Sequence, residues 1–110
     1  MRGFLILCLA LASCSETRRF DRAEWANADL SGRARADMLP DLLRRHPLEG
    51  RTRADVIALL GEPTPTDKWE GADMIYVLGN DGTWTGVDHE WLLIELDRRH
   101  RVEWFTTVRD

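Results

Sequence analysis

The clearest hydrophobic pattern in the chain lies at residues 52–61 and predicts a short helix. Its apolar residues recur at the spacing of one helix face, at Val56, Ile57, Leu59 and Leu60. Thr52 is a favourable N-cap, with Asp55 three residues later as the capping-box acid. Gly61 supplies a left-handed position after the last turn, and Pro63 prevents continuation. Because a helix of about eight residues is unstable alone in water, it must dock on the rest of the protein.

A second helix is predicted at residues 38–46, before the first. Asp37 is placed to cap it, and Pro40 falls in its first turn, where the missing N–H does no harm. Pro47 is expected to end it. Its apolar side comprises Met38, Leu39, Leu42 and Leu43.

Beyond residue 63 the apolar positions change from a helical to an alternating period, which predicts strands. The expected strands cover residues 74–78, 90–97 and 102–108. The first has apolar side chains on both faces, so we expect it at the centre of the sheet. In the third, Val102, Trp104 and Val108 are expected to share one face. Phe105 is expected on the opposite face.

Two short N-terminal helices followed by three closely connected strands predict an α+β fold, with the helices packed on a three-stranded antiparallel meander. The domain is expected to cover residues 37–110. Residues 14–36 are polar and rich in Arg, Asp and Ala, which predicts a tether. Phe20 and Trp25 stand isolated in this segment, and we expect them to pin it to the domain rather than to bind a partner.

Residues 1–13 are predicted to be an export signal peptide. Arg2 provides a short positive region, residues 4–12 are uninterruptedly apolar, and small residues precede the expected cleavage point. A membrane-spanning helix needs about 20 apolar residues, so a retained transmembrane segment is the weaker interpretation.

The sequence Leu11-Ala12-Ser13-Cys14 resembles the lipobox of bacterial lipoproteins. The resemblance implies cleavage before Cys14, which would carry a diacylglycerol group and further acyl chains such as palmitate. Two or more chains anchor a protein stably to a membrane. Ser15 resembles the residue that sends such proteins to the outer membrane, so a location in the cell envelope facing the periplasm is expected. An ordinary secretory leader, or an intracellular chain with an apolar start, is the alternative.

Composition limits the size of the fold and the class of partner. A chain of 110 residues with 44% apolar residues forms one domain with a thin core. Its net charge is −4, and loss of Arg2 with the leader leaves 14 basic against 19 acidic residues, so nucleic acid is not an expected partner. With Cys8 removed and Cys14 acylated, neither a disulfide nor a Cys-based metal site is expected.

Within residues 37–108 the chain resembles the SmpA/OmlA family of small bacterial outer-membrane lipoproteins, which includes the BamE-like subunit of the β-barrel assembly machinery. The resemblance is carried by Gly50-Arg51-Thr52, Val56, Leu59-Leu60-Gly61, Pro63, and a later strand ending in Leu96-Asp97. It implies the same α+β fold and a role in outer-membrane protein assembly or envelope integrity. The last hairpin departs from the family, because His100 stands where a turn Gly is usual; His tolerates a positive φ better than most residues. No partner-binding residue of the family can be matched to this sequence.

Motifs of catalysis and metal binding were not found. The chain has no His-Glu-x-x-His, no Gly-x-Ser-x-Gly and no phosphate-binding glycine loop. Asp88, His89 and Glu90 alternate along a strand and therefore point to opposite faces. The sequence predicts a protein that is not an enzyme and needs no cofactor or metal.

Two segments are candidates for partner contacts. Trp84, at the tip of the loop 79–88, is expected either to be exposed for recognition or to fold back as a lid over the sheet edge. Arg98, Arg99 and Arg101 form a basic turn, either a solvated tip or a docking site for an acidic partner or lipid head group. The predicted function is a membrane-anchored, non-catalytic protein-interaction module. A small-ligand-binding or enzyme-inhibiting module is the alternative.

Overall fold

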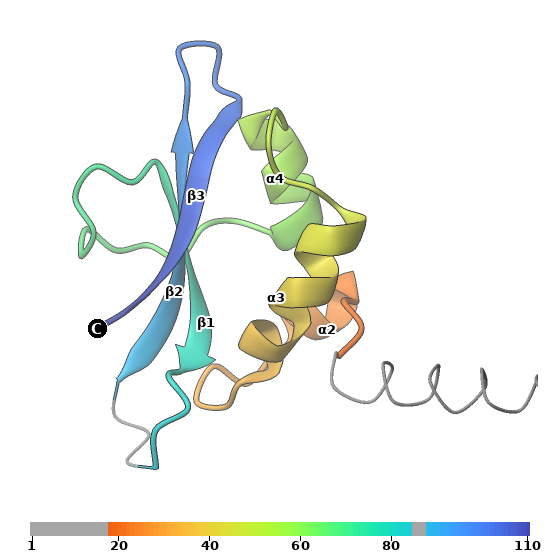
Figure 1. Ribbon diagram of the computed structural model, residues 1–110, viewed down its shortest axis with the longest axis vertical. Coiled ribbons are helices and arrows are strands. Elements are labelled where there is room, and N and C mark those ends of the chain that lie inside the picture. The colour runs from red at the N-terminus through yellow and green to blue at the C-terminus, as the bar shows by residue number, and fades with distance from the viewer. Residues whose placement is uncertain (1–17, 85–87) are drawn as a thin grey trace, which may run out of the picture.

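The computed structural model describes residues 18–84 and 88–110, which form three helices and one three-stranded sheet. These elements are α2 (Arg22–Ala26), α3 (Ala34–Arg45), α4 (Arg53–Leu60), β1 (Met74–Asn80), β2 (His89–Leu96) and β3 (Val102–Arg109). The strand order is β1-β2-β3, and both pairs are antiparallel. All three helices lie on one side of the sheet (Figure 1), which confirms the α+β class and the meander. The prediction of two helices omitted α2.

Helix α4 has the predicted ends. The Thr52 hydroxyl accepts a hydrogen bond from the Asp55 N–H at 3.1 Å, and the Asp55 carboxylate accepts one from the Thr52 N–H at 3.4 Å. Gly61 follows the last turn with φ 85°. Val56 and Leu60 are buried in the core. The helix is therefore fixed by local signals at both ends and by docking along its apolar side.

Helix α3 begins four residues earlier than predicted, so Asp37 is not its cap and Pro40 lies inside it. The N-cap is Arg33, which makes no side-chain capping bond. The first turn is held instead by Arg35, which donates to the Trp25 carbonyl at 2.9 Å and to the Val77 carbonyl at 3.0 Å. These tertiary contacts stabilise a helix start that the Pro-containing sequence does not signal.

The segment predicted as a tether is folded where the structure describes it. Phe20 and Trp25 are buried in the core, so the expectation that they pin this segment to the domain is confirmed. Asp41 is only 3% exposed and accepts from the Phe20 N–H at 2.8 Å and from Arg45 Nε at 2.9 Å. It also pairs with Arg44. The hydrogen bond from Phe20 contributes most to lowering the pKa of Asp41, and the two arginines act in the same direction.

Strand β1 lies at an edge of the sheet, so its predicted central position is wrong. Its second edge is covered by the connection from α4, in which the Thr64 N–H donates to the Ile75 carbonyl at 2.7 Å. The Val77 N–H in turn donates to the Thr64 hydroxyl at 3.1 Å. Ile75 and Val77 face away from the helices and are nevertheless buried. Strand β1 is therefore buried on both faces because the loop after α4 covers it, although it has only one neighbouring strand.

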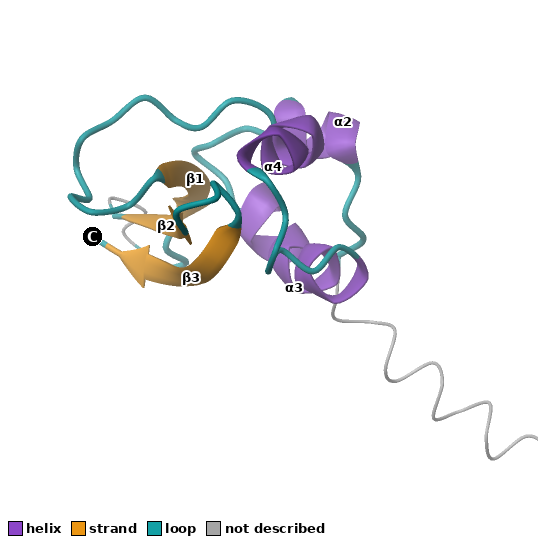
Figure 2. Cartoon of the chain, turned by 90° about the horizontal axis from the view of Figure 1, so that it is seen from above, coloured by secondary structure: helices purple, strands orange, loops and turns teal. Residues whose placement is uncertain are grey.

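A bulge in β3 moves Val102 to the face opposite the one predicted, whereas Trp104 and Val108 do lie opposite Phe105 as expected. Glu95 pairs with Trp104 but Leu96 pairs with Val102, so Glu103 is an extra residue. Val102 and Phe105 consequently both contact the core, on the side of the helices. Trp104 lies on the outer face and is 50% exposed. Figure 2 shows the helices beside the sheet and the long loop after α4 passing over β1.

Candidate functional site

The connection from β1 to β2 has a firmly built base. The buried Asp81 accepts from the N–H and the hydroxyl of Thr83, at 2.9 and 2.8 Å, and these bonds lower the pKa of its carboxyl group. The Asp81 N–H donates to the Asp88 carbonyl across the loop at 3.0 Å. The Asn80 side chain accepts from the Gly82 N–H and donates to the Ser31 carbonyl, both at 2.8 Å. The loop therefore leaves the sheet from a fixed platform.

Close backbone contact ties this platform to the turn before α3. A Cβ on Gly79 would lie 2.1 Å from the Gly32 carbonyl oxygen, which no side chain permits, and Gly79 has φ 126°. The Asn80 N–H donates to that same carbonyl at 2.9 Å. Arg33 Nη1 reaches the Asn80 carbonyl at 2.6 Å and Glu90 Oε1 at 3.3 Å. These contacts require a glycine at position 79.

Trp84 projects from this platform and is 96% exposed. The alternative in which it folds back as a lid over the sheet edge is therefore wrong. Residues 85–87 of the predicted 79–88 loop lie outside the described part of the chain. An exposed indole of this size on an anchored loop is a feature of binding surfaces, where Trp is enriched.

The turn from β2 to β3 is organised by Asp97. One of its carboxylate oxygens accepts from the N–H groups of Arg99 and Arg101, at 2.8 and 3.0 Å, and these bonds lower the pKa of Asp97. His100 has φ 63°, as the sequence led us to expect. Arg98, Arg99 and Arg101 are all exposed. The turn thus presents a fixed cluster of positive charge to solvent.

Arg51 and Arg53 adjoin this turn, and sequence reasoning did not include them. The Arg53 N–H donates to the His100 carbonyl at 3.0 Å, and the Arg51 carbonyl accepts from Val102 at 2.8 Å. Arg101 Nη1 reaches the Gly50 carbonyl at 3.1 Å. None of the arginines at 51, 53, 98, 99 and 101 forms an ion pair with any residue that the structure describes. Their grouping depends on strand β3 meeting the start of α4, which no local motif reveals.

The two predicted contact regions do not form one site. Trp84 precedes β2 and the basic turn follows it, so they lie at opposite ends of the sheet (Figure 1). Cys14 and the predicted leader lie outside the described residues. Among the residues that are described, no helix has the length and apolar character needed to cross a membrane.

The outer face of the sheet carries three tryptophans and is a third candidate surface, which sequence reasoning missed. Trp69, Trp91 and Trp104 belong to this side, the first from the long loop after α4 and the others from the strands. Lys68 pairs with Asp110 at 3.2 Å and lies 5.8 Å from the centre of the Trp69 ring. Hydrogen bonding from the His89 N–H, and then contacts with Lys68 and Trp91, lower the pKa of Asp110. The bulge that places Val102 on the face opposite Trp104 leaves no local signature in the sequence.

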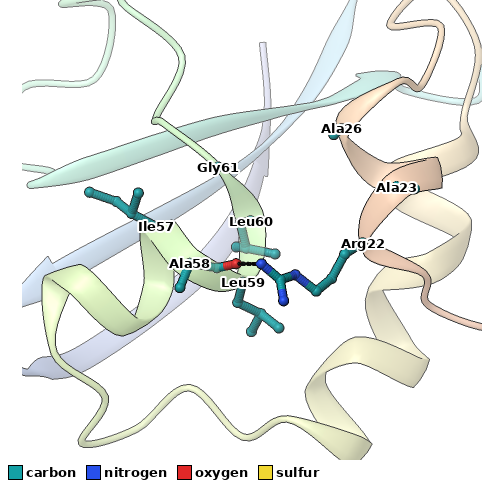
Figure 3. Close-up of a pocket in the computed structure, with 8 residues that line it drawn as sticks. All are labelled: Arg22, Ala23, Ala26, Ile57, Ala58, Leu59, Leu60 and Gly61. Atoms are coloured by element: carbon teal, nitrogen blue, oxygen red, sulfur yellow. Dashed lines mark hydrogen bonds between the residues drawn. The ribbon is translucent and has the colours of Figure 1, made fainter.

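A groove of about 510 Å³ lies between α2 and α4 (Figure 3). It is lined by Arg22, Ala23, Ala26, Ile57, Ala58, Leu59, Leu60 and Gly61. Among the described residues that line the groove, Arg22 alone has a charged side chain, and its guanidinium already donates to the Ala58 carbonyl. The groove is thus apolar and lacks the convergent polar groups of a small-molecule site.

The groups that resembled acid–base or metal chemistry are used structurally. Glu90 pairs with Arg33 at 3.3 Å, whereas the His89 ring lies 6.2 Å from that of Trp91. In the described part of the chain no cluster of three His, Cys, Asp or Glu side chains is arranged to hold a metal. Tyr76 donates to the Gly61 carbonyl at 2.8 Å, and burial raises the pKa of its hydroxyl.

Comparison of the chain with protein-family models, with curated proteins and with solved structures gives no match. The SmpA/OmlA resemblance therefore stays a prediction that rests on the residues quoted for it.

Proposed function

We propose that this protein is a membrane-anchored, non-catalytic interaction module of the bacterial cell envelope, and that it contacts a protein partner through Trp84. The observation that carries the proposal is the 96% exposure of Trp84 on a loop whose base is fixed by Asp81 and Asn80. A rigid aromatic side chain buries a large area on binding and loses little conformational entropy in doing so. This is the physical character of a binding hot spot.

The basic turn supports the same proposal from the opposite end of the sheet. Five arginines without ion pairs among the described residues stand on a chain whose net charge is −4. Such a separation of charge favours one orientation during an encounter with an acidic surface. Arg98, Arg99 and Arg101 are accordingly proposed as contacts for an acidic partner or for lipid head groups.

The anchor and the cellular role rest on the sequence. Cys14 is the proposed lipid attachment site, with the domain facing the periplasm and the outer membrane as its location. A part in outer-membrane protein assembly or envelope integrity follows from the SmpA/OmlA resemblance. A small-ligand or inhibitor role would use the groove between α2 and α4, whose apolar lining and already bonded arginine favour it less.

The proposal is tested by crosslinking the full-length protein in membranes and identifying what copurifies with it. Trp84→Ala should remove the crosslinked partner, while Trp84→Phe should retain a substantial part of it because a ring remains. The unfolding midpoint should stay the same in both variants, since the side chain is almost fully exposed. Undiminished crosslinking of Trp84→Ala would overturn the assignment of this side chain.

The anchor is tested separately. Cys14→Ser should move the protein from the detergent phase to the aqueous phase in a phase-partitioning experiment, because it removes the proposed acyl chains. Equal partitioning of the wild type and the variant would contradict the lipid anchor without bearing on Trp84.

A further inference from the structure

Strand β3 has an open edge. At its start, the Val102 N–H donates to the Arg51 carbonyl at 2.8 Å and the Val102 carbonyl accepts from Gly50 at 2.9 Å. From Glu103 to Arg109 the edge away from β2 has no backbone partner in the described part of the chain. Figure 2 shows β3 on the side of the sheet away from the loop that passes over β1. The regular part of this edge, from Trp104 to Arg109, is thus available for pairing, and the bulged Glu103 adjoins it.

The backbone groups that point outward follow from the ladder with β2. The Asp110 N–H donates to the His89 carbonyl at 3.1 Å, and successive residues of an antiparallel strand point alternately toward and away from their neighbour. Phe105, Thr107 and Arg109 therefore direct their N–H and carbonyl groups away from β2. Thr106 directs its own groups toward β2.

The protection of this edge is confined to its start, where the bulge at Glu103 interrupts the strand. Exposed edges are commonly blocked by Pro, by charged side chains and especially Lys, by a bulge, or by a covering segment. Strand β1 has such a cover in Thr64, whereas residues 103–109 contain neither Pro nor Lys. The only charged side chains in this stretch are Glu103 and Arg109, one at each end. Both are exposed, and neither forms an ion pair with a described residue.

The sequence of this edge is complementary to itself when it is reversed about Thr106. An antiparallel pair of two copies in that register places opposite charges, aromatic with β-branched residues, and two threonines against each other, which are favourable cross-strand pairs. The pairs are Glu103 with Arg109, Trp104 with Val108, Phe105 with Thr107, and Thr106 with Thr106.

We propose that β3 pairs with β3 of a second copy of this chain, antiparallel and centred on Thr106, to give a continuous six-stranded sheet. The outward backbone groups of Phe105 and Thr107 then meet those of Thr107 and Phe105 in the second copy, which satisfies both edges. A two-fold axis perpendicular to the sheet keeps the helices of both copies on one side. Trp104, half exposed in the single chain, gains Val108 of the second copy as its neighbour on the outer face.

Disulfide trapping at two adjacent threonines tests this register. In the full chain with Cys8→Ser and Cys14→Ser, an introduced cysteine is the only thiol. Thr106→Cys places the two sulfur-bearing residues in a non-hydrogen-bonded pair, with Cα atoms about 4.5 Å apart and within disulfide range. Thr107→Cys, the matched control, faces position 105 and lies about 7–8 Å from its own copy, which is beyond easy bridging.

Mild oxidation should therefore give several-fold more covalent dimer from Thr106→Cys than from Thr107→Cys, and the difference should vanish in urea. Circular dichroism shows whether both variants are folded. Equal yields under folding conditions, or no dimer from either variant, would overturn the proposed pairing. Capture of a different protein at position 106 in place of a second copy would overturn it as well.

Charge exchange provides an independent readout in the uncrosslinked full chain. Glu103→Arg and Arg109→Glu should each weaken dimerisation, measured by sedimentation, by about two- to thirty-fold, because two symmetry-related ion pairs become repulsive. The double variant should restore dimerisation and has the net charge of the wild type. A wild-type chain that sediments as a monomer at all concentrations, or a double variant no better than either single one, would contradict the pairing.

Discussion

The two faces of the sheet differ in how they are covered. On the side of the helices, Met74, Tyr76, Leu92 and Ile94 are almost inaccessible to solvent and pack beneath α3 and α4. On the opposite side Ile75 and Val77 are buried under a loop, but Trp104 is half exposed. Both faces are apolar, so composition alone does not separate them. The difference is that helices cover one face, whereas only a loop covers part of the other.

The two faces of the sheet therefore have different roles. The helix-covered face holds the fold together, because the core on this side contains buried aromatic and aliphatic side chains from every described helix and strand, and also Phe20 and Leu48 from the segments before and between them. The outer face is crossed by residues 61–73, which are attached at Thr64 and through the Lys68–Asp110 ion pair. Surface available to other molecules therefore lies on the outer face, along β3 and at the two ends of the sheet.

The largest effect is expected on the helix-covered face. Leu60→Ala should lower the free energy of unfolding by about 2–5 kcal/mol, because it leaves a cavity under α4. Leu59→Ala is the matched control on the same helix, where the side chain is only half buried and the loss should be smaller. Urea unfolding midpoints measure both. A midpoint of Leu60→Ala equal to that of the wild type would remove α4 from the core and contradict the division between the faces.

Low pH should destabilise the helical side of the fold, because it protonates the carboxylate of Asp41 on α3. The folded state lowers the pKa of this carboxyl, chiefly through the Phe20 N–H, below its value of about 3.9 in the unfolded chain. Its stabilisation is therefore complete above about pH 4 and is lost as the pH falls toward the folded pKa. Between pH 7 and pH 3 the thermal unfolding midpoint should fall less steeply for Asp41→Asn than for the wild type. At pH 7 the midpoint of the variant should be the lower of the two. Parallel pH profiles would exclude Asp41 as a source of the acid dependence.

The cap of α4 gives a smaller and purely local effect. Thr52→Ala should cost about 1 kcal/mol, because the Asp55 N–H loses its acceptor at the start of the helix. Thr52→Ser keeps a hydroxyl in the same place and should restore most of the loss. Denaturant midpoints distinguish the two variants. A serine variant as unstable as the alanine variant would mean that the methyl group, not the cap, is responsible.

The sequence predicted those features that depend on interactions between residues close together in the chain, and it missed those that depend on contacts between distant residues. Helix α4 was predicted with its ends because Thr52, Asp55 and Gly61 act within a few residues of one another. The start of α3 was missed because Arg35 holds it through carbonyls of Trp25 and Val77, which are distant in sequence.

The same distinction between local and long-range interactions applies to the sheet and to the candidate site. The alternating pattern located all three strands, but it did not distinguish burial under a loop from burial between strands, and so it misplaced β1. The loop of Trp84 and the basic turn were recognised from their composition. The exposure of Trp84, and the addition of Arg51 and Arg53 to the turn, depend on tertiary structure.

The smallest effect on folding is expected on the outer face. Trp104 and Phe105 are adjacent in β3 and therefore point to opposite sides of the sheet. Trp104→Ala should change the free energy of unfolding by less than about 1 kcal/mol, since half of the side chain is already in water. Phe105→Ala should cost more, although the ring it removes is smaller, because Phe105 packs against the core. Unfolding midpoints of both variants, measured at one protein concentration, compare the faces within a single strand. A larger loss for Trp104→Ala would show that the outer face contributes more to folding than the helix-covered face does in this strand, against the division between the two faces.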